Sequence, residues 1–598
     1  MNKKLMTVVL GALVAATCGP DLLGCAPQII DVGSDPDIDA GSDPDIDAGS
    51  RDDGRIDVPS PDAGHQDAAS LAPTCGDGVM EGQEECDNGL GNSDTAPNAC
   101  RLDCTLPSCG DGVIDPDNEE ECDAGEGNVN TPEAACQRNC RVPSIVSLGV
   151  SARYYNIVSD NNDAVHMVWV EGILGNNVYY GQIVDGAVPN RELTPAAGVN
   201  STKHRPSIGV KPDGSEVHFT WVSPNATEPY LIKDCWRSSS GVWSTDTVHD
   251  FSPAGRSVQF PSIVVDLHGV AHCTASDWTM ANTDMPIAYF RKPAGGVWTR
   301  QGDLASATEH NRESTMFVDP AGGVHVTWTI DKLYLKYRYA PSGGNLANSP
   351  TLDVPDDHLR NRWSEIFVDR QDNVHLVSLS YENPGSLTFA NHTSMALGAS
   401  AFPMLVDTSA EPFTTLEYIP SPVVGAVSEN GVAVALVEMF SNVHYQTKVD
   451  GAWATYTLDE TAAVLEHSRV VMATTQDSAH LVWRGGDGTL RLATYALLDL
   501  SVTSPGGGES WPAGSPQTIT WNAAGLSGDV KLLLYKNDVR VGTIATQIPA
   551  TQKSYSWAVG SLVGEANAAT NAGYRIRIRT ADGRLVDQSD GDFSIVSP

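Results

Sequence analysis

The sequence predicts a mainly β protein, with a seven-bladed β-propeller, a small disulfide-rich module before it and a β-sandwich after it. Three observations predict this fold. A strand that carries a His recurs about every fifty residues, eight cysteines form two matching sets of four, and the style of the sequence changes again near the carboxyl terminus. Self-similarity at a period of this length is typical of repeat architectures.

Each repeat contains four short stretches that are typical of β-strands. An apolar run such as Pro261–Asp266 ends in a turn, and an alternating stretch with the His follows. A third stretch and a glycine turn then lead to a Trp and a fourth stretch. Four strands in a unit of this length make one propeller blade. The repeats are centred on His166, His218, His272, His325, His375 and His480, with a degenerate seventh copy at Ala433.

The last repeat supplies only three strands, which end near Leu497. The apolar run Val142–Val150, ahead of the first complete repeat, has no other assignment. We therefore predict that it forms the missing outer strand, which closes the ring and leaves no open edge between the first and last blades. The propeller is expected to span residues 142–500.

The amino-terminal segment has the features of an export signal. Two lysines precede the short apolar run Leu5–Thr17, and residues 1–24 are expected to be a signal peptide. The stretch Leu22–Cys25 resembles the lipobox of bacterial lipoproteins, which implies that Cys25 is lipidated and that the protein is held at the outer membrane or cell surface, or is secreted. Cys18 is a rival lipidation site, and a plain secretory peptide is the other alternative. We expect the lipid to be the membrane attachment, since no other segment is apolar for long enough to cross a bilayer.

Residues 25–70 are expected to form a disordered acidic tether. They contain two copies of Ser-Asp-Pro-Asp-Ile-Asp-Ala-Gly and almost nothing that could form a core. Residues 26–142 hold 28 acidic residues against five arginines, and the whole chain has a formal net charge of −38. A chain this acidic is not expected to bind nucleic acid.

The module at residues 71–141 contains two repeats of four cysteines. Both repeats open with Cys-Gly-Asp-Gly-Val, contain Glu-Cys-Asp and close with Cys-x3-Cys. Zinc binding is the alternative to disulfide bonds, but zinc sites favour paired short spacings with His, and export favours disulfides. We therefore expect disulfides within each repeat, among Cys75, Cys86, Cys100 and Cys104, and among Cys109, Cys122, Cys136 and Cys140.

These spacings resemble the disulfide-rich repeats of myxobacterial surface proteins, which are similar to Notch-type repeats. No resident cofactor or metal is expected, except that the Notch-type resemblance implies calcium as a candidate; the alternative is a solvated acidic loop. The candidate calcium ligands are Asp77, Asp87, Asp111 and Asp123. Elsewhere, Cys235 and Cys273 lie on neighbouring predicted blades. They are expected to form one disulfide or to remain as two free buried thiols.

From Ser501 onward the sequence contains a different set of short strands. Examples are Ile519–Trp521, Leu532–Tyr535 and Tyr574–Arg579, after the opening stretch Thr503–Trp511. This segment resembles the immunoglobulin-like domain of Kre9/Knh1-type cell-wall proteins. The resemblance implies that residues 501–598 form an Ig-like β-sandwich, an accessory domain that is associated with glycan and carries no catalytic residue.

The familiar catalytic motifs are absent from the sequence. There is no His-Glu-x2-His zinc motif, no Gly-x-Ser-x-Gly nucleophile elbow and no glycine loop for phosphates or dinucleotides. The recurrent histidines, one in each blade, would lie too far apart to share a metal ion. Their repetition favours an architectural role, such as a hydrogen bond between blades.

A set of arginines recurs just ahead of the first strand of the repeats and is the candidate ligand-binding site. The innermost strand of a blade lines the propeller axis, so these residues are expected to surround one mouth of the central channel. The planar guanidinium suits carboxylates and sulfates, and a cationic mouth on an acidic protein would attract anions. The alternative is architectural, with each Arg paired to an Asp of a neighbouring blade. The set comprises Arg153, Arg205, Arg312, Arg362 and Arg469, with Arg256 as a displaced sixth member.

This arrangement resembles sialidase-like propellers and propeller polysaccharide lyases. The sialidase Asp-box is reduced to Gly-x-Trp, as in Gly241–Trp243, and no Tyr–Glu nucleophile pair can be assigned. Tyr154 or Tyr155, beside Arg153, is a candidate lyase base. We therefore expect a binding module for acidic glycan or another extracellular partner, with a glycan-cleaving enzyme of sialidase-like or lyase type as the alternative.

Overall fold

The computed structural model of the protein describes part of the chain, in which the regular structure consists of β-strands and short 3-10 turns. The chain divides into two units, and the described residues all belong to the second one, Leu71–Pro598. None of the helices in this part is long and apolar enough to cross a membrane. The described residues are 75–598, without 83, 153, 172–176, 197–205, 226–227, 255, 279–284, 306–310, 331–333, 356–359, 369–371, 382–386, 404–406, 409–412, 415–423, 429–430, 438–442, 450–451, 460–469, 476–477, 498, 525, 527 and 565.

Seven successive antiparallel sheets form the propeller in the described part of the chain. The first three blades are β2 (Tyr154–Ser159), β3 (Val165–Glu171), β4 (Asn177–Ile183) and β5 (Glu192–Leu193); β6 (Ser207–Val210), β7 (Val217–Asn225), β8 (Glu228–Arg237) and β9 (Trp243–Asp250); and β10 (Ser257–Val265), β11 (Ala271–Trp278), β12 (Ile287–Lys292) and β13 (Thr299–Asp303). The next three are β14 (Asn311–Val318), β15 (Val324–Ile330), β16 (Tyr334–Ala340) and β17 (Leu352–Val354); β18 (Arg360–Val368), β19 (Asn373–Tyr381), β20 (Leu387–Ala396), β21 (Asp407–Thr408) and β22 (Phe413–Thr414); and β23 (Val424–Ser428), β24 (Gly431–Val437), β25 (Val443–Val449) and β26 (Ala452–Asp459). The seventh contains β27 (Val471–Thr474), β28 (Ser478–Arg484) and β29 (Thr489–Ala496), and the 3-10 turns η4 (Ser252–Ala254) and η5 (Leu346–Asn348) lie between strands.

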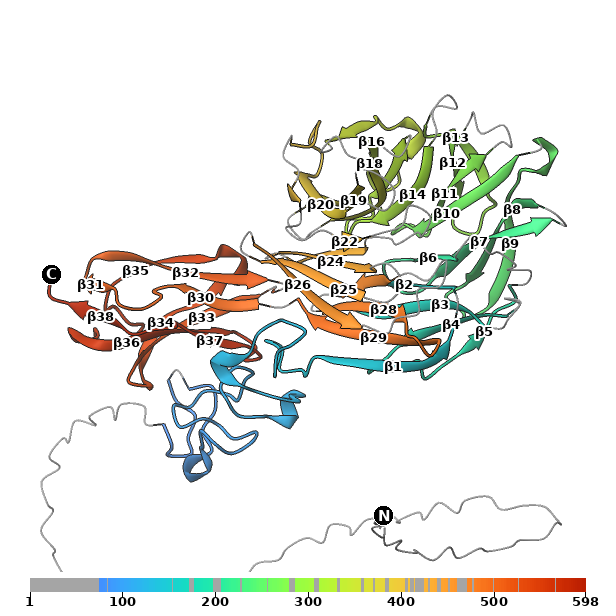
Figure 1. Cartoon of the computed structure of the whole chain (residues 1–598). Coiled ribbons are helices and arrows are strands. Elements are labelled where there is room, and N and C mark those ends of the chain that lie inside the picture. Colours follow the sequence, from blue (N-terminus) through green and yellow to red (C-terminus); the bar gives the residue numbers. More distant parts are fainter. Residues whose placement is uncertain are drawn as a thin grey trace, which may run out of the picture. The chain divides into compact units, whose positions relative to one another are not determined.

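The first strand of the propeller closes the ring. β1 (Ser144–Ser151) pairs antiparallel with β29, with Ile145 opposite Ala493, and completes the seventh sheet in the order β1-β29-β28-β27. The innermost strands β2, β6, β10, β14, β18, β23 and β27 contact one another in succession, and β27 contacts β2 again. Figure 1 shows the sheets following one another around this ring. The prediction that the run beginning at Val142 supplies the outer strand of the last blade is confirmed.

Apolar side chains hold neighbouring blades together. One core cluster joins Val168 of the first blade to Phe219 of the second, and both side chains are fully buried. Burial of a side chain of this size stabilises the fold by about 1.5–3 kcal/mol. The Trp after a glycine turn adds a polar link, because Trp243 Nε1 donates to Glu192 Oε2 of the preceding blade at 2.8 Å. Trp298 makes the equivalent bond one blade further on.

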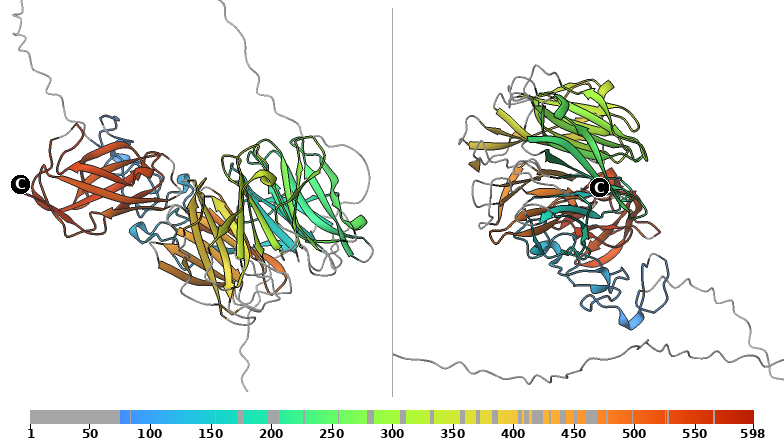
Figure 2. Two further views of the ribbon diagram at one scale, coloured as in Figure 1. Left: turned by 90° about the horizontal axis from the view of Figure 1, so that it is seen from above. Right: turned by 90° about the vertical axis from the view of Figure 1, so that its right-hand side faces the viewer.

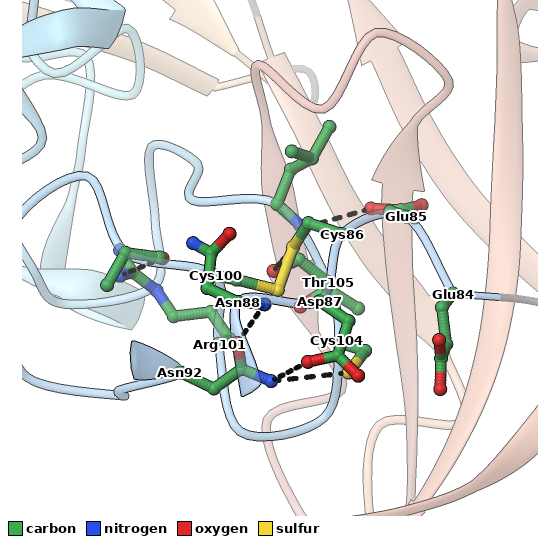
Figure 3. Close-up of a disulfide and its surroundings, with 12 residues drawn as sticks. Glu84, Glu85, Cys86, Asp87, Asn88, Asn92, Cys100, Arg101, Cys104 and Thr105 are labelled. Carbon is green, nitrogen blue, oxygen red and sulfur yellow. Dashed lines mark hydrogen bonds between the residues drawn. A yellow bond between two sulfur atoms is a disulfide. The ribbon is translucent and has the colours of Figure 1, made fainter. Parts of the chain in front are cut away.

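Four disulfide bonds organise the module ahead of the propeller, and all of them lie within a repeat. Each repeat joins its first cysteine to its last and its second to its third, and Figure 3 shows one of the inner bonds. Repeats this small depend on such bonds because they cannot bury much apolar surface. The bonds are Cys75–Cys104, Cys86–Cys100, Cys109–Cys140 and Cys122–Cys136, and the turns η1 (Gly89–Gly91), η2 (Pro116–Asn118) and η3 (Gly125–Gly127) lie between them.

The carboxyl-terminal domain is a sandwich of two β-sheets around a core that contains Trp521, Trp557 and Tyr574. One sheet has the order β30-β32-β35, and the other has the order β31-β38-β36-β33-β34, with β37 beside β36. The strands are β30 (Asp499–Ser504), β31 (Ser510–Pro512), β32 (Pro516–Ala524), β33 (Asp529–Lys536), β34 (Val539–Pro549), β35 (Ser554–Ala558), β36 (Asn571–Thr580), β37 (Val586–Gln588) and β38 (Phe593–Val596), with the turn η6 (Ala550–Gln552).

The second cysteine repeat and the sandwich share a core. Cys109 forms a parallel β-bridge with Leu585, and both residues belong to the same hydrophobic cluster. Lys531 Nζ of β33 lies 2.5 Å from Glu85 Oε1 of the first repeat. Both views of Figure 2 show the module, in blue, beside the sandwich, in red. The sandwich therefore contacts both cysteine repeats.

Candidate functional site

Two of the predicted arginines occupy the same position on neighbouring innermost strands. Arg312 lies opposite Thr329 in the β14–β15 pair, and Arg362 lies opposite Leu379 in the β18–β19 pair. In both pairs the register shifts directly after the arginine. The predicted equivalence of these two residues is therefore seen in the backbone. Outside the described residues lie Arg153, Arg205 and Arg469.

The register shift is a β-bulge that recurs in three successive blades. β10 shifts between Gln259 and Ser262, so Gln259 stands where the next two blades have arginine. Residues in these bulges adopt left-handed backbone angles, with φ of 51° at Phe260 and 53° at Glu313. That conformation costs a non-glycine residue roughly 1–2 kcal/mol. Bulges re-aim nearby side chains and are frequent beside binding sites, so this end of the innermost strands is the candidate site.

Buried hydroxyl groups fasten the bulges to the preceding blade. Thr274 Oγ1 of β11 lies 3.0 Å from Ser314 Oγ in the bulge of β14. Thr327 Oγ1 of β15 lies 3.3 Å from Ser364 Oγ in the bulge of β18. The strand segments that carry Arg312 and Arg362 are thus fixed by two blades each.

Arg256, the displaced member of the set, is committed to an ion pair at the start of β10. Its Nε donates to Asp277 Oδ1 at 2.5 Å, and Arg300 Nη2 lies 3.5 Å from Asp277 Oδ2. Burial raises the pKa of Asp277, although the two guanidinium groups lower it. The architectural alternative expected an ion pair between neighbouring blades. Asp277 is instead on β11 of the same blade as Arg256, so this pair does not link two blades.

In the described part of the chain, three of the recurrent histidines form hydrogen-bonded triads with an Asp and a Tyr of the same blade. In the third blade His272 Nε2 donates to Asp266 Oδ2 at 3.3 Å, and the Tyr289 hydroxyl donates to His272 Nδ1 at 2.7 Å. Burial lowers the pKa of His272, so the ring is held in its neutral form. The architectural interpretation thus has a physical basis, but the expected bond between blades was wrong. The same triad recurs as His166 with Asp160 and Tyr180, and as His325 with Asp319 and Tyr337.

The second blade replaces the triad with a buried ionic cluster. Asp234 stands in place of the tyrosine, 3.1 Å from His218 Nδ1, and Glu216 Oε1 lies 3.2 Å from His218 Nε2. Burial lowers the pKa of His218, but the two carboxylates outweigh burial and raise this pKa to about 9. Lys292 and Trp298 of the next blade also contact Asp234. The cluster is therefore part of the joint between these two blades.

The tyrosines considered as a lyase base are core residues. Tyr155 packs in the cluster between the last and first blades, with Trp169 and Val482. Tyr154 packs in the cluster between the first and second blades. Their exposed fractions are 2% and 6%. A general base must reach its substrate, so this geometry does not favour the lyase alternative.

Cys235 and Cys273 are free, buried thiols, which decides between the two alternatives for this pair. Burial raises the pKa of both thiols, so neither is an activated nucleophile. The predicted lipidation residue Cys25 and its rival Cys18 lie outside the described residues.

Clusters of metal-ligand atom types occur in both cysteine repeats among the described residues. The sulfur atoms in them belong to disulfide bonds and are not thiolate ligands. One or two carboxylates then remain in each cluster, too few for a cation site. The clusters are Cys75, Glu84 and Cys104, and Glu120, Asp123 and Cys140.

The bulge beside the arginines was not anticipated from the sequence, although a spacing signals it. Arg312 precedes the triad residue Asp319 by seven residues, and Gln259 precedes Asp266 by the same number. Counting back from the triad aspartate therefore locates the site in a new blade. The left-handed Glu313 that follows has no comparable signal.

The comparisons with known proteins give one family match, over the sandwich, and solved structures of similar fold. Residues 504–595 match the family described as the Kre9/KNH-like N-terminal Ig-like domain. No curated protein matches the chain. The Hadza microbial sialidase Hz136 is 9% identical over 56% of this chain and 73% of its own, with a TM-score of 0.36. The alpha-L-arabinofuranosidase arb93a of Fusarium graminearum is 12% identical over 49% and 91%, with a TM-score of 0.34. The intramolecular trans-sialidase of Ruminococcus gnavus is 8% identical over 59% and 97%, with a TM-score of 0.32. This is a likeness of fold alone.

Proposed function

We propose that the protein is a surface-displayed lipoprotein whose propeller binds an acidic glycan, or another acidic extracellular partner, where its innermost strands begin. The observation that carries this proposal is the common position of Arg312 and Arg362, each directly before a bulge on neighbouring strands. Arginines at the same position on adjacent strands are like charges that an anionic ligand would offset. Carboxylate and sulfate groups match the geometry of arginine.

The charge of the chain supports an anionic ligand that is captured at a local cationic site. With a net charge of −38, the molecule as a whole repels polyanions, so binding depends on the few positions where arginines gather. By the same argument nucleic acid is not an expected partner, because it requires an extended basic surface.

Display at the cell surface is the second part of the proposal. It rests on the lipobox at Cys25, the acidic tether at residues 25–70 and the disulfide-bonded repeats, which suit an oxidising compartment. The lipid is the proposed membrane attachment. Mass spectrometry of the amino-terminal peptide of the mature protein tests it: a diacylglyceryl Cys25 is expected, and an unmodified amino terminus elsewhere contradicts the proposal.

The binding test compares two double variants of the full chain on an array of acidic and neutral glycans. Arg312→Ala with Arg362→Ala is expected to weaken binding of acidic glycans at least tenfold. The control, Arg491→Ala with Lys336→Ala, removes the same charge from ion pairs with Asp487 and Asp353 on other parts of the propeller. It is expected to bind as the wild type does. Equal binding by both double variants contradicts the proposed site.

A product assay on each bound polysaccharide distinguishes binding from cleavage. Under the proposal the polysaccharide is recovered intact after prolonged incubation. Release of a free acidic sugar would replace the binding function with a sialidase-like hydrolase, and release of an unsaturated uronate would replace it with a lyase. The burial of Tyr154 and Tyr155 argues against the lyase outcome.

A further inference from the structure

The two sequence motifs of the cysteine repeats meet in a single structural device. In the first repeat Asp87 is the last residue of the Glu-Cys-Asp motif. Its Oδ2 accepts three backbone N–H bonds from the Cys-Gly-Asp-Gly-Val motif. The donors are Gly76, Asp77 and Gly78, at 3.0, 3.1 and 3.1 Å. Its Oδ1 accepts the N–H of Gly89 at 2.7 Å and the side-chain N–H of Asn92 at 3.1 Å. Figure 3 shows Asn92 directed at this carboxylate.

The second repeat contains the same kind of hydrogen-bond network around Asp123. Its Oδ2 accepts the N–H groups of Gly110 and Gly112 at 2.9 and 3.0 Å. Its Oδ1 accepts the N–H of Gly125 at 2.7 Å and the side-chain N–H of Asn128 at 2.9 Å. Four of the five contacts recur independently, which indicates that the motifs encode them.

Glycine is required for this geometry. Gly76 and Gly78 have φ of 94° and 85°, and Gly110 and Gly112 have φ of 100° and 88°. Alternating left-handed residues turn successive N–H groups toward one side of the chain, which forms a concave site for an anion. Here the anion is a carboxylate of the protein itself.

The carboxylates considered as calcium ligands do not fit that role. Calcium needs six to eight oxygen atoms at about 2.3–2.6 Å, with their lone pairs directed at the ion. The oxygens of Asp87 and Asp123 are directed instead at N–H donors, whose positive ends repel a cation. Asp77 and Asp111 are also engaged, since their Oδ1 atoms accept N–H bonds from Val79 and Val113 at 2.8 and 3.0 Å.

We infer that these repeats fold and persist without a divalent cation, because the carboxylates of Asp87 and Asp123 organise the loops that a metal would otherwise hold. The same N–H bonds hold the pKa of Asp87 below its usual value, although desolvation raises it. The repeats are thus expected to be independent of calcium in the medium.

Hydrogen exchange of the full-length wild-type protein tests this inference directly. The amides of Gly76–Gly78 and Gly110–Gly112 are expected to exchange slowly, at the same rate in EDTA and in millimolar calcium chloride. A calcium site would give the opposite pattern, with protection in calcium and fast exchange in EDTA, and that result overturns the inference.

A variant adds a second, independent test. Asp87→Asn is expected to speed exchange at Gly76–Gly78 in both media, while Gly110–Gly112 in the second repeat remain protected and serve as an internal control. Asp94→Asn is the matched control in the same repeat, because among the described residues Asp94 accepts a single bond, from Leu102 N–H in the loop. Unchanged exchange in Asp87→Asn would show that the carboxylate does not organise the loop.

Discussion

Replacing His272 with phenylalanine tests whether the triads within blades stabilise the propeller. Phenylalanine keeps most of the volume of the ring and removes both nitrogen atoms. The change leaves the Tyr289 hydroxyl without its acceptor and Asp266 Oδ2 without its donor. All three side chains are fully buried, so water cannot replace the lost partners.

The expected magnitude follows from these two orphaned groups. A buried polar group left without a partner costs about 1–3 kcal/mol, and a charged group costs more. Asp266 retains the N–H bonds of His268 and Val270 at Oδ1, which limits its share of the loss. We expect His272→Phe to lower the free energy of unfolding of the propeller by roughly 3–5 kcal/mol.

The assay is equilibrium unfolding in urea, followed by tryptophan fluorescence. His268→Ala is the matched control, because the His268 side chain lies exposed in the same turn and is hydrogen-bonded to the hydroxyl of Ser342. It is expected to change stability by less than about 0.5 kcal/mol. His272→Phe with Tyr289→Phe is expected to cost less than the sum of the two single changes, since the orphaned hydroxyl is gone. Additive losses, or a loss no larger than in the control, would refute the reasoning.

The same variant has a predicted signature in acid. Burial lowers the pKa of His272 below the ordinary value of 6.5, so the folded state binds fewer protons than the unfolded state. The contribution of His272 is therefore present above pH 6.5 and is lost as the pH falls below it. The wild type should lose stability faster than His272→Phe between about pH 6.5 and pH 5.

Three further outcomes are expected. Since His218 has a raised pKa of about 9, its contribution is present at neutral pH and is lost as the pH rises through that value, so thermal melts of His218→Gln should depend less on pH between 7 and 10 than those of the wild type. Cys235 and Cys273 are buried, so a maleimide should label them only after denaturant is added; labelling of the native protein would contradict the buried thiols. Gly110→Ala should destabilise the protein more than Gly76→Ala in matched melts, because a Cβ at Gly110 would overlap a carbonyl of the sandwich, whereas one at Gly76 meets nothing.

The propeller could be predicted because its repeat signal is local in the sequence. His272, Asp266 and Tyr289 lie within one blade, so the pattern that holds a blade together also repeats with the blade. The closing strand could be predicted by counting the strands of each repeat, because the last repeat lacked one strand and one apolar run had no other assignment. Matching cysteine spacings likewise predicted disulfides within each repeat, because all the partners are close in the chain.

Features that depend on backbone geometry or on distant partners could not be predicted. The left-handed angle at Glu313 follows from a bulge that no residue type requires. The partner of Arg256 follows from strand register, which places Asp277 beside it on β11. The bond between Glu85 and Lys531 joins residues 446 positions apart, and no periodicity relates them.

In each blade that has both, the stabilising triad and the proposed binding position lie at opposite ends of the same strand pair. In the third blade the triad lies where β10 and β11 meet at the turn, while Gln259 and the bulge lie toward the other end, opposite Ser276. Along β11 the triad residue His272 is four residues from Ser276, which corresponds to roughly 13 Å at about 3.3 Å per residue. Changes that far apart contribute to stability independently. Substitution of Arg312 and Arg362 should therefore alter the proposed ligand binding with little effect on the triads, whereas substitution of the triad residue His325 should lower the stability of the fourth blade, which carries Arg312.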